Sequence, residues 1–231
     1  MDTISQFVAN NAAWIHEAVS ASGLPGEFTP VLWQNHHDMP PIFPNADTLG
    51  GTESEQLAAI TALIKRRPGR VTVVKDAWAR LDLTPLGFEP LFEAAWIYRN
   101  ACPLAIPVEN VGLERVTTAE GLRAFAAACN GEKLAGVYSH KLLNRPDIAW
   151  IAAHREGNLI GGVTAFLAHG MNGINNLFAP DNAIADGLIR AAVNAFPDVP
   201  ACGYEGEDTA APFLALGFQT MGKLRVWIRQ T

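Results

Sequence analysis

A chain of 231 residues, of which 49% are hydrophobic and 17% charged, has enough apolar material to bury a core in one large domain or two small ones. This composition excludes a disordered protein. The formal net charge of -6 gives no attraction for nucleic acid or for an anionic membrane surface, because both bind clustered lysine and arginine.

The first residues predict a helix rather than a targeting segment. Apolar side chains recur at helical spacing over residues 3–20, at Ile4, Phe7, Val8, Trp14, Ile15 and Val19. The segment has no basic stretch with a cleavage site, and no apolar run approaches the roughly 18 residues that cross a membrane. Three cysteines at wide spacing favour neither a disulfide framework nor a zinc site. We therefore expect a soluble, cytoplasmic protein.

The rest of the first half predicts a loop, a helix and extended strands. Residues 34–45 are polar and rich in proline, which is typical of a loop. Thr52 and Glu55 form a capping box, which predicts a helix over residues 53–66. Residues 71–78 are rich in β-branched side chains and predict a strand, and residues 86–99 predict a strand pair or one long bent strand. Two prolines in residues 103–110 indicate a linker.

The second half predicts a helix, a meander and a mixed ending. The helix is expected at about residues 118–129, and three antiparallel strands follow over residues 147–180, separated by glycine and asparagine turns. A helix at about residues 183–196 and a strand at 201–206 come next. A short helix over residues 208–216, capped by Asp208, and a closing hairpin over residues 217–229 complete the expected order.

The two halves share a similar stretch. The copies that start at Leu86 and Leu216 both begin Leu-Gly-Phe and end in a Trp-Ile pair, at Trp96 and at Trp227, with one residue of slack. In the same order, a helix, a proline and a strand precede each copy. This order favours a duplicated half-domain, and the alternative is coincidence.

The C-terminal segment, from about residue 110 to residue 229, resembles the GCN5-related N-acetyltransferase (GNAT) family. The resemblance rests on the order of elements and on the LALGF sequence at residues 214–218, and it covers about half of the chain. It implies an α/β fold with a mixed sheet, the acyl-CoA N-acyltransferase fold. Residues 106–231 would form a complete copy and residues 1–105 a truncated N-terminal half.

The resemblance also implies an acetyl-CoA site at a parted strand and the helix that follows it. A strand that leaves its neighbour has free backbone groups for the pantetheine arm and the reacting carbonyl, and helix N-terminal amides bind the pyrophosphate. The two strands are expected to part around residue 177. The cofactor-binding candidates are Asn176, Leu177, Phe178, Ala179, Ala183, Ala185, Asp186 and Gly187.

The sequence departs from the family's turn pattern, which is Gln or Arg, two residues, Gly, one residue, then Gly or Ala. Over residues 180–185 only Ala185 fits. Pro180 replaces the long polar residue, and Ala183 adds a methyl group where phosphate approaches. Asp181 or Asn182 is expected to cap the helix, and a carboxylate 5 Å from a phosphate costs about 3 kcal/mol at an effective dielectric of about 20. We expect a phosphate site that the chain itself partly fills.

The catalytic candidates are few. Transfer to an amine needs a group that accepts the amine proton and a donor to the leaving thiolate. The remaining candidates are Glu205, Glu207 and Asp208, at the end of a strand with Tyr204 beside them. Glu205 is the candidate base acting through water, and its alternative is a solvated carboxylate at a helix start. Asp208 is expected to be an N-cap. Many members of the family place a tyrosine where this chain has Phe213, which cannot donate a proton.

Other residues have simpler interpretations. His169 ends a strand and is expected on the surface. His36, His37 and Asp38 are adjacent, point in different directions and lack a third partner at suitable spacing, so we do not expect a metal site. Trp33 is either a core residue or the floor of a substrate pocket.

The sequence leaves two functions open. One is an acetyl-CoA-dependent N-acetyltransferase that transfers directly to a small amine in a ternary complex. The other is a non-catalytic protein of the same fold that binds a ligand or a partner through a degenerate CoA site. The order of elements favours the first, and Pro180, Ala183 and Phe213 favour the second. We expect no nucleic-acid or membrane partner; a homodimer stays open, because a second chain or the other half must complete the short N-terminal sheet.

Overall fold

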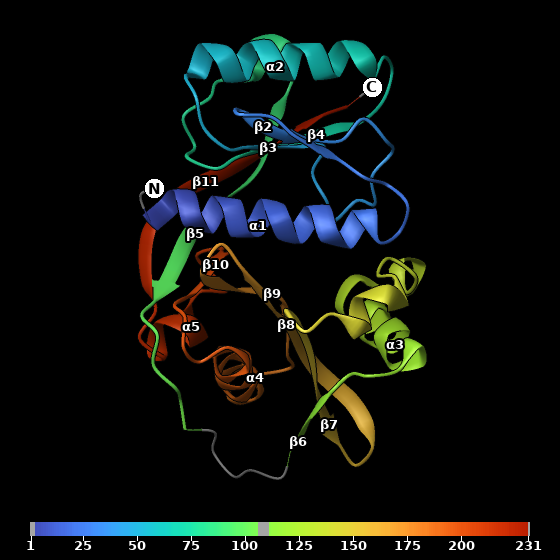
Figure 1. The fold of residues 1–231 in the computed structure, drawn as a ribbon, viewed down its shortest axis with the longest axis vertical. Coiled ribbons are helices and arrows are strands. Elements are labelled where there is room, and N and C mark those ends of the chain that lie inside the picture. The colour runs from blue at the N-terminus through green and yellow to red at the C-terminus, as the bar shows by residue number, and fades with distance from the viewer. Residues whose placement is uncertain (1–2, 106–110, 231) are drawn as a thin grey trace.

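One continuous sheet organises the described part of the chain. The computed structural model describes residues 3–105 and 111–230, and there the sheet has eleven strands in the order β1-β2-β3-β4-β11-β5-β10-β9-β8-β7-β6 (Figure 1). The strands are β1 (Glu27–Phe28), β2 (Leu32–Gln34), β3 (Ala46–Thr48), β4 (Thr72–Asp76), β5 (Glu89–Arg99), β6 (Gly112–Arg115), β7 (Ile148–Arg155), β8 (Asn158–Ala168), β9 (Met171–Phe178), β10 (Ala201–Glu205) and β11 (Gln219–Arg229).

The helices begin where the sequence offers caps. They are α1 (Thr3–Ser20), α2 (Glu53–Arg66), α3 (Ala119–Asn130), α4 (Asn182–Ala195) and α5 (Ala211–Ala215), with 3-10 turns at Thr84–Leu86, Glu132–Leu134 and His140–Asn144. The capping box of α2 is present, with Thr52 and Glu55 bonded to each other's backbone amides. The predicted helices α1 to α4 and the β7–β8–β9 meander are confirmed, within a residue or two at their ends.

The final strands of the two halves are exchanged. β11 lies between β4 and β5, with Asp76 opposite Arg225, and β5 lies between β11 and β10, with Glu205 opposite Ala95. All of these pairings are antiparallel. The sheet of the N-terminal half is therefore completed by the C-terminal strand of the same chain.

Several sequence predictions of elements are wrong or incomplete. The predicted closing hairpin is one long strand, β11. Its register with β5 shifts between Thr220 and Gly222, where the glycine resembles a turn residue in the sequence. Asp208 is exposed and caps nothing, because α5 starts after Ala210 without a side-chain cap. β1, β2, β3 and β6 were missed, since strands of two to four residues carry no periodic signal. The predicted linker lies in coil up to residue 105, and residues 106–110 lie outside the described residues.

Helices cover both faces of the sheet. Alternate residues of β7 point to opposite sides, so that Trp150 packs with α1 and α3 while Ile151 packs with α4. α2 covers β2 and β4 at the N-terminal end of the sheet (Figure 1). In the described ranges, no helix combines the length and the apolar character that a bilayer crossing needs. Cys102, Cys129 and Cys202 are free thiols, and Cys102 is exposed.

A buried asparagine fixes α1 against the strands of the C-terminal half. The amide nitrogen of Asn10 donates to the carbonyl oxygens of Phe166, Ala168 and Met171, at 3.0 to 3.2 Å. The side chain fits because Gly173 beside it has no Cβ: a Cβ there would overlap the Asn10 amide oxygen. α1 of the N-terminal half is thereby held across β8 and β9 (Figure 1).

Gly173→Ala should lower the free energy of unfolding by about 1–3 kcal/mol, because the added methyl group must displace Asn10 from its three acceptors. Chemical denaturation measures the change. Gly136→Ala is the matched control, since its Cβ would meet nothing closer than 4.0 Å, and it should stay within about 0.5 kcal/mol of the original protein. Equal stability of the two variants would contradict the close contact between α1 and β9.

Candidate functional site

Two neighbouring parallel strands part in the C-terminal half. β9 and β10 pair at Asn172 with Ala201 and at Gly173 with Cys202, and the paired register of the described residues ends there. β9 continues to Phe178, so the strands separate after residue 173, earlier than the predicted parting around residue 177. The backbone of β9 beyond that point has no strand partner on the β10 side.

A bulge turns the end of β9. The register with β8 steps from Thr164 opposite Asn175 to Gly162 opposite Phe178, which gives β9 one extra residue. Asn176 sits in this extra segment with a φ of 55°, in the left-handed region. Its side chain is held on two sides, because the Tyr138 hydroxyl donates to Oδ1 at 2.8 Å and its Nδ2 donates to Thr164 Oγ1 at 3.1 Å.

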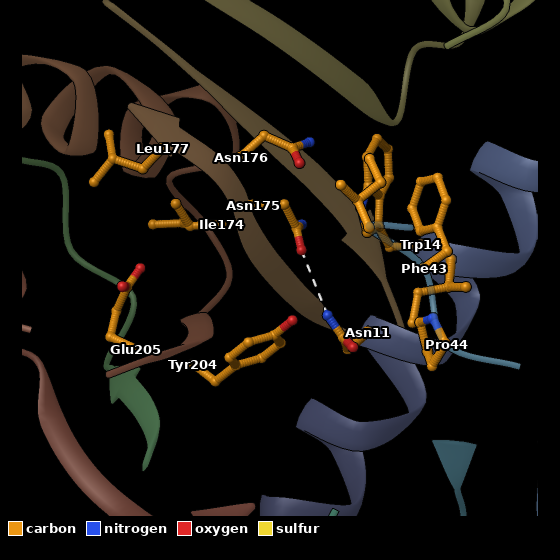
Figure 2. A pocket seen from close by; sticks show the side chains of 12 residues that line it. Asn11, Trp14, Phe43, Pro44, Ile174, Asn175, Asn176, Leu177, Tyr204 and Glu205 are labelled. Atoms are coloured by element: carbon orange, nitrogen blue, oxygen red, sulfur yellow. Dashed lines mark hydrogen bonds between the residues drawn. The ribbon is translucent and has the colours of Figure 1, made fainter. Parts of the chain in front are cut away.

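A cavity of about 260 Å³ occupies the gap (Figure 2). Its walls come from α1, from residues 42–44, from β9 and from β10, so both halves of the chain contribute. The lining residues are Asn11, Trp14, Ile15, Ile42, Phe43, Pro44, Ile174, Asn175, Asn176, Leu177, Tyr204 and Glu205.

Glu205 is the carboxylate at this cavity. Burial raises its pKa from the ordinary 4.5 to about 7, and the Thr209 hydroxyl, which donates to Oε2 at 2.6 Å, opposes the rise. A carboxyl with a pKa near 7 exchanges protons readily at neutral pH, which suits a general base. In Figure 2, Glu205 lies on the side of Leu177, across the cavity from α1.

Tyr204 lies next to Glu205 at the end of β10, and a buried chain of polar groups supports it. The Tyr204 ring packs edge-on against Trp96 at 5.6 Å, and the Lys75 ammonium lies 5.4 Å from its centroid. Lys75 also pairs with Asp47 at 2.9 Å and donates to the Asn11 side chain. Asn11 Nδ2 in turn donates to Asn175 Oδ1 at 3.5 Å (Figure 2). Charges of the N-terminal half thus support the cavity of the C-terminal half.

Solved structures share this arrangement of strands and helices. A GCN5-related N-acetyltransferase from Kribbella flavida superposes with a TM-score of 0.70 at 12% identity, covering 100% of this chain and 97% of that one. An acetyltransferase of the GNAT family from Colwellia psychrerythraea has a TM-score of 0.51 at 13% identity, covering 100% and 98%. The chain has the GNAT fold.

A third structure with this fold is a tandem GNAT protein from the clavulanic acid biosynthesis pathway, with a TM-score of 0.52 at 13% identity over 79% of this chain and 74% of that one. Compared by sequence, the chain matches no family model and no curated protein. The predicted mixed α/β sheet of the GNAT fold is confirmed, and the likeness covers the whole chain rather than the C-terminal half alone.

The helix start that follows β9 in this GNAT fold is capped by the chain's own carboxylate. Asp181 is the N-cap of α4, and its Oδ1 accepts the N–H of Ile184 at 2.9 Å, as predicted. One of the amides that would face a phosphate is therefore engaged, and a negative charge stands at the helix start.

The structure brings four of the predicted site residues together and separates the rest. Asn176, Leu177, Tyr204 and Glu205 line one cavity. The other six cofactor-binding candidates lie outside its lining: Phe178, Ala179, Ala183, Ala185, Asp186 and Gly187. Their roles stay predictions.

The structure describes the surroundings of all six: Ala179 packs against the apolar cluster of α4, and a Cβ at Gly187 would lie 3.8 Å from the Leu113 side chain. The Phe178 ring packs edge-on against Phe125 at 5.2 Å, and Ala185 is buried. Asp186 pairs with Arg190 at 2.6 Å, and Ala183 is exposed. The charge of Asp186 is thereby already compensated within α4.

Three other residues considered from the sequence, Trp33, Phe213 and Asp38, pack in the core or form an ion pair. Trp33 is fully buried in the core, and its Nε1 donates to His16 Nδ1 at 3.2 Å, so the pocket-floor alternative is wrong. Phe213 is also a core residue, packed on Phe218 at 5.2 Å. Asp38, beside the two histidines, pairs with Arg70 at 3.2 Å.

The other polar candidates lie at the surface. Glu207, Asp208 and His169 are exposed. Among the residues that the structure describes, no group of three or more His, Cys, Asp and Glu side chains could hold a metal ion.

Sequence reasoning missed the walls from the N-terminal half. Asn11, Trp14 and Phe43 line the cavity, yet Trp14 was assigned only to the core face of the first helix. One signal was available: Asn11 lies on that apolar face, four residues after Phe7 and four before Ile15. A polar residue on a core-facing helix stripe needs a buried partner, and here the partners are Lys75 and Asn175.

Proposed function

We propose that this chain is an acyl-CoA-dependent N-acyltransferase that transfers an acetyl group to a small amine, directly and within a ternary complex. One observation carries the proposal: a cavity passes between the parted strands β9 and β10, and it is lined by a carboxyl whose pKa burial raises to about 7. The GNAT fold supports it.

The gap fits one end of acetyl-CoA better than the other. The backbone of β9 after Gly173 has no strand partner on the β10 side, which suits the amide groups of a pantetheine arm. The start of α4 suits the pyrophosphate poorly, because Asp181 occupies the Ile184 amide and repels an anion. When bound, acetyl-CoA supplies the acyl group and a thiolate leaving group.

Residues of the chain itself supply the remaining catalytic roles. Glu205 accepts the amine proton, directly or through a water molecule, and passes it to solvent on the side of the exposed Thr209. Backbone N–H groups at the β9 bulge, near Leu177 or Phe178, orient the reacting carbonyl. Tyr204 contributes the hydroxyl of the cavity wall and is the candidate donor to the leaving group, since Phe213 is buried and apolar.

We also infer that the two halves arose by duplication. In the sheet, β4 of the first half pairs with β11, the final strand of the second half, and β10 of the second half pairs with β5, the final strand of the first half. β4 ends at Asp76 and β10 ends at Glu205, and burial raises the pKa of both carboxyl groups. Each carboxylate lines a cavity, and that of Asp76 measures about 500 Å³ at the start of α2. The cavity of Glu205 is also lined by the end of β9 that has no strand partner on the β10 side, so we propose the donor site there.

The second candidate function is non-catalytic binding of a ligand or partner by a protein with the GNAT fold. The Asp181 cap favours it, because a donor site closed at its phosphate end binds acetyl-CoA weakly. The two functions differ in one measurable quantity, the affinity for acetyl-CoA.

Asp181→Gly should tighten acetyl-CoA binding by at least tenfold, and by about a hundredfold if the carboxylate lies about 5 Å from the phosphate. Glycine is nearly as good an N-cap, so α4 should lose only a few tenths of a kcal/mol. Isothermal titration calorimetry gives the affinities, and S-acetylpantetheine without the pyrophosphate is the matched ligand, whose affinity should not change.

A complementary thermal-shift titration tests the donor site as a whole. Acetyl-CoA at about 1 mM should raise the melting temperature, because a ligand that binds only the folded state stabilises it by mass action. If neither the original protein nor Asp181→Gly is stabilised, the acyltransferase proposal is wrong and non-catalytic binding remains.

A further inference from the structure

The wall of the cavity that faces Glu205 is apolar and rigid, and the N-terminal half supplies it. Trp14, Ile15 and Phe43 are each less than 7% exposed. The Trp14 ring is packed against Trp150 at 5.6 Å and Phe166 at 5.7 Å, so it cannot turn away from the cavity. In Figure 2, Trp14, Phe43 and Pro44 stand together on the α1 side. This wall suits the flat or branched body of an apolar ligand.

The charge of the lining has one sign. Of the described residues that line the cavity, none is Lys, Arg or His, and Glu205 is the carboxylate among them. Lys75 lies nearby but is 2% exposed, and it is engaged by Asp47 and Asn11. The lining therefore has nothing to neutralise a carboxylate or phosphate on a ligand, while it attracts an ammonium group.

The amide groups of the lining are largely used within the protein. Asn176 is bonded to Tyr138 and Thr164. Asn175 Nδ2 donates to the Gly173 carbonyl at 3.2 Å, and its Oδ1 accepts from Asn11. Among the polar side chains of the lining, this leaves the Glu205 carboxylate and the Tyr204 hydroxyl for a ligand. A ligand with many hydroxyl groups would lose its hydration without compensation.

We propose that the cavity takes a primary amine with an aromatic or branched aliphatic body and no carboxylate or phosphate, its amino group toward Glu205 and its body against Trp14 and Phe43. As the acyl acceptor, this amine rests on the proposed function. The bound ammonium first loses one proton through Glu205 to solvent. The neutral nitrogen then forms the new C–N bond as the C–S bond of the thioester breaks; the thiolate keeps the electron pair of that bond, and the second proton released by the nitrogen also passes through Glu205 to solvent.

The first test compares 2-phenylethylamine with phenylalanine, which differ only by a carboxylate beside the amine. Isothermal titration calorimetry at pH 8, without acetyl-CoA, should show phenylethylamine binding at least tenfold more tightly. Glu205→Gln should reduce that preference at least tenfold, because it removes both the attraction for the ammonium and the repulsion of the carboxylate. Glu207→Gln is the control: it changes an exposed carboxylate nearby and should keep the preference.

The second test compares phenylethylamine with ethylamine, which lacks the ring. Phenylethylamine should again bind at least tenfold more tightly. Ile42→Ser, at the exposed rim of the apolar wall, should lower this ratio, whereas Val71→Ser, at a similarly exposed apolar residue outside the cavity lining, should not. A ratio near one in the original protein overturns the proposal.

The outcomes separate this inference from the proposed function. Phenylethylamine that binds but is not acetylated in the presence of acetyl-CoA supports the ligand class and contradicts the acyltransferase. Equal acetylation of phenylalanine and phenylethylamine supports the acyltransferase and overturns the ligand class. No heat from phenylethylamine at millimolar concentration also overturns it.

Discussion

Glu205→Gln should lower kcat for acetyl transfer by about 10²–10⁴-fold and leave the Kd for acetyl-CoA nearly unchanged. Glutamine keeps the size of the side chain and can still bond to the Thr209 hydroxyl, but it cannot accept a proton from the amine. Steady-state assays that follow thiol release give kcat, and calorimetry gives Kd. A loss of affinity with unchanged kcat would place Glu205 in binding instead.

The pH profile of the same pair of proteins gives an independent check. Because the base must be ionised, kcat/KM should rise with pH through an inflection near 7, the pKa to which burial raises Glu205. Stability should move the other way. A carboxyl whose pKa is higher in the folded state contributes stability below about pH 4.5, and this contribution is lost as pH rises through about 7. Glu205→Gln should remove both dependences.

Two further variants distinguish a base from a general charge effect. Thr209→Val removes the hydroxyl whose hydrogen bond lowers the pKa of Glu205, so the inflection should move to higher pH while activity above it is kept. Glu207→Gln removes an exposed carboxylate two residues away and should leave the profile in place. An inflection that moves in Glu207→Gln but not in Thr209→Val would contradict the assignment.

Local signals in the sequence predicted most elements but could not predict how the final strands pair. The capping box at Thr52 and the periodic face from Phe7 to Val19 depend on neighbours within a few residues, and both predictions are confirmed. The placement of β11 between β4 and β5 depends on which distant strand offers free backbone groups. The repeated Leu-Gly-Phe segments indicated two similar strands, yet their sequences are compatible with pairing inside each half or across the halves.

The candidate site also has parts that local sequence predicts and parts that depend on distant residues. Glu205 was identified because a carboxylate at a strand end is visible in one stretch of sequence, and it lines the cavity from the end of β10. The pKa of its carboxyl depends on burial by residues far away in the chain. Trp14 reaches the same cavity from α1, which Asn10 fixes across β8 and β9, and Phe43 reaches it from the segment between β2 and β3. The hydrogen bond between Asn10 and Met171 joins residues about 160 positions apart in the sequence. No local sequence pattern encodes contacts of this kind.

Lys75→Met should lower the free energy of unfolding by about 3–5 kcal/mol, the usual cost of leaving a buried charge without its partner. Lys75 is 2% exposed and lies 2.9 Å from Asp47, which is fully buried. Methionine fills most of the volume, so the loss reports the charge rather than a cavity. Denaturation at pH 8 measures it. The loss should shrink at pH 5, because burial already raises the pKa of Asp47 to about 6, and an unpaired Asp47 becomes neutral more readily.

Adding Asp47→Leu to Lys75→Met should restore most of the lost stability, because an apolar pair replaces a desolvated ion pair at little net cost. The proposed acetyltransferase activity should not return with it. Lys75 donates to Asn11 and lies over the Tyr204 ring, and both side chains line the cavity, so an apolar pair leaves them without their anchor. A double variant with normal stability and a raised KM for the amine would show that the buried pair positions the acceptor site. Normal KM together with normal stability would limit Lys75 to a structural role.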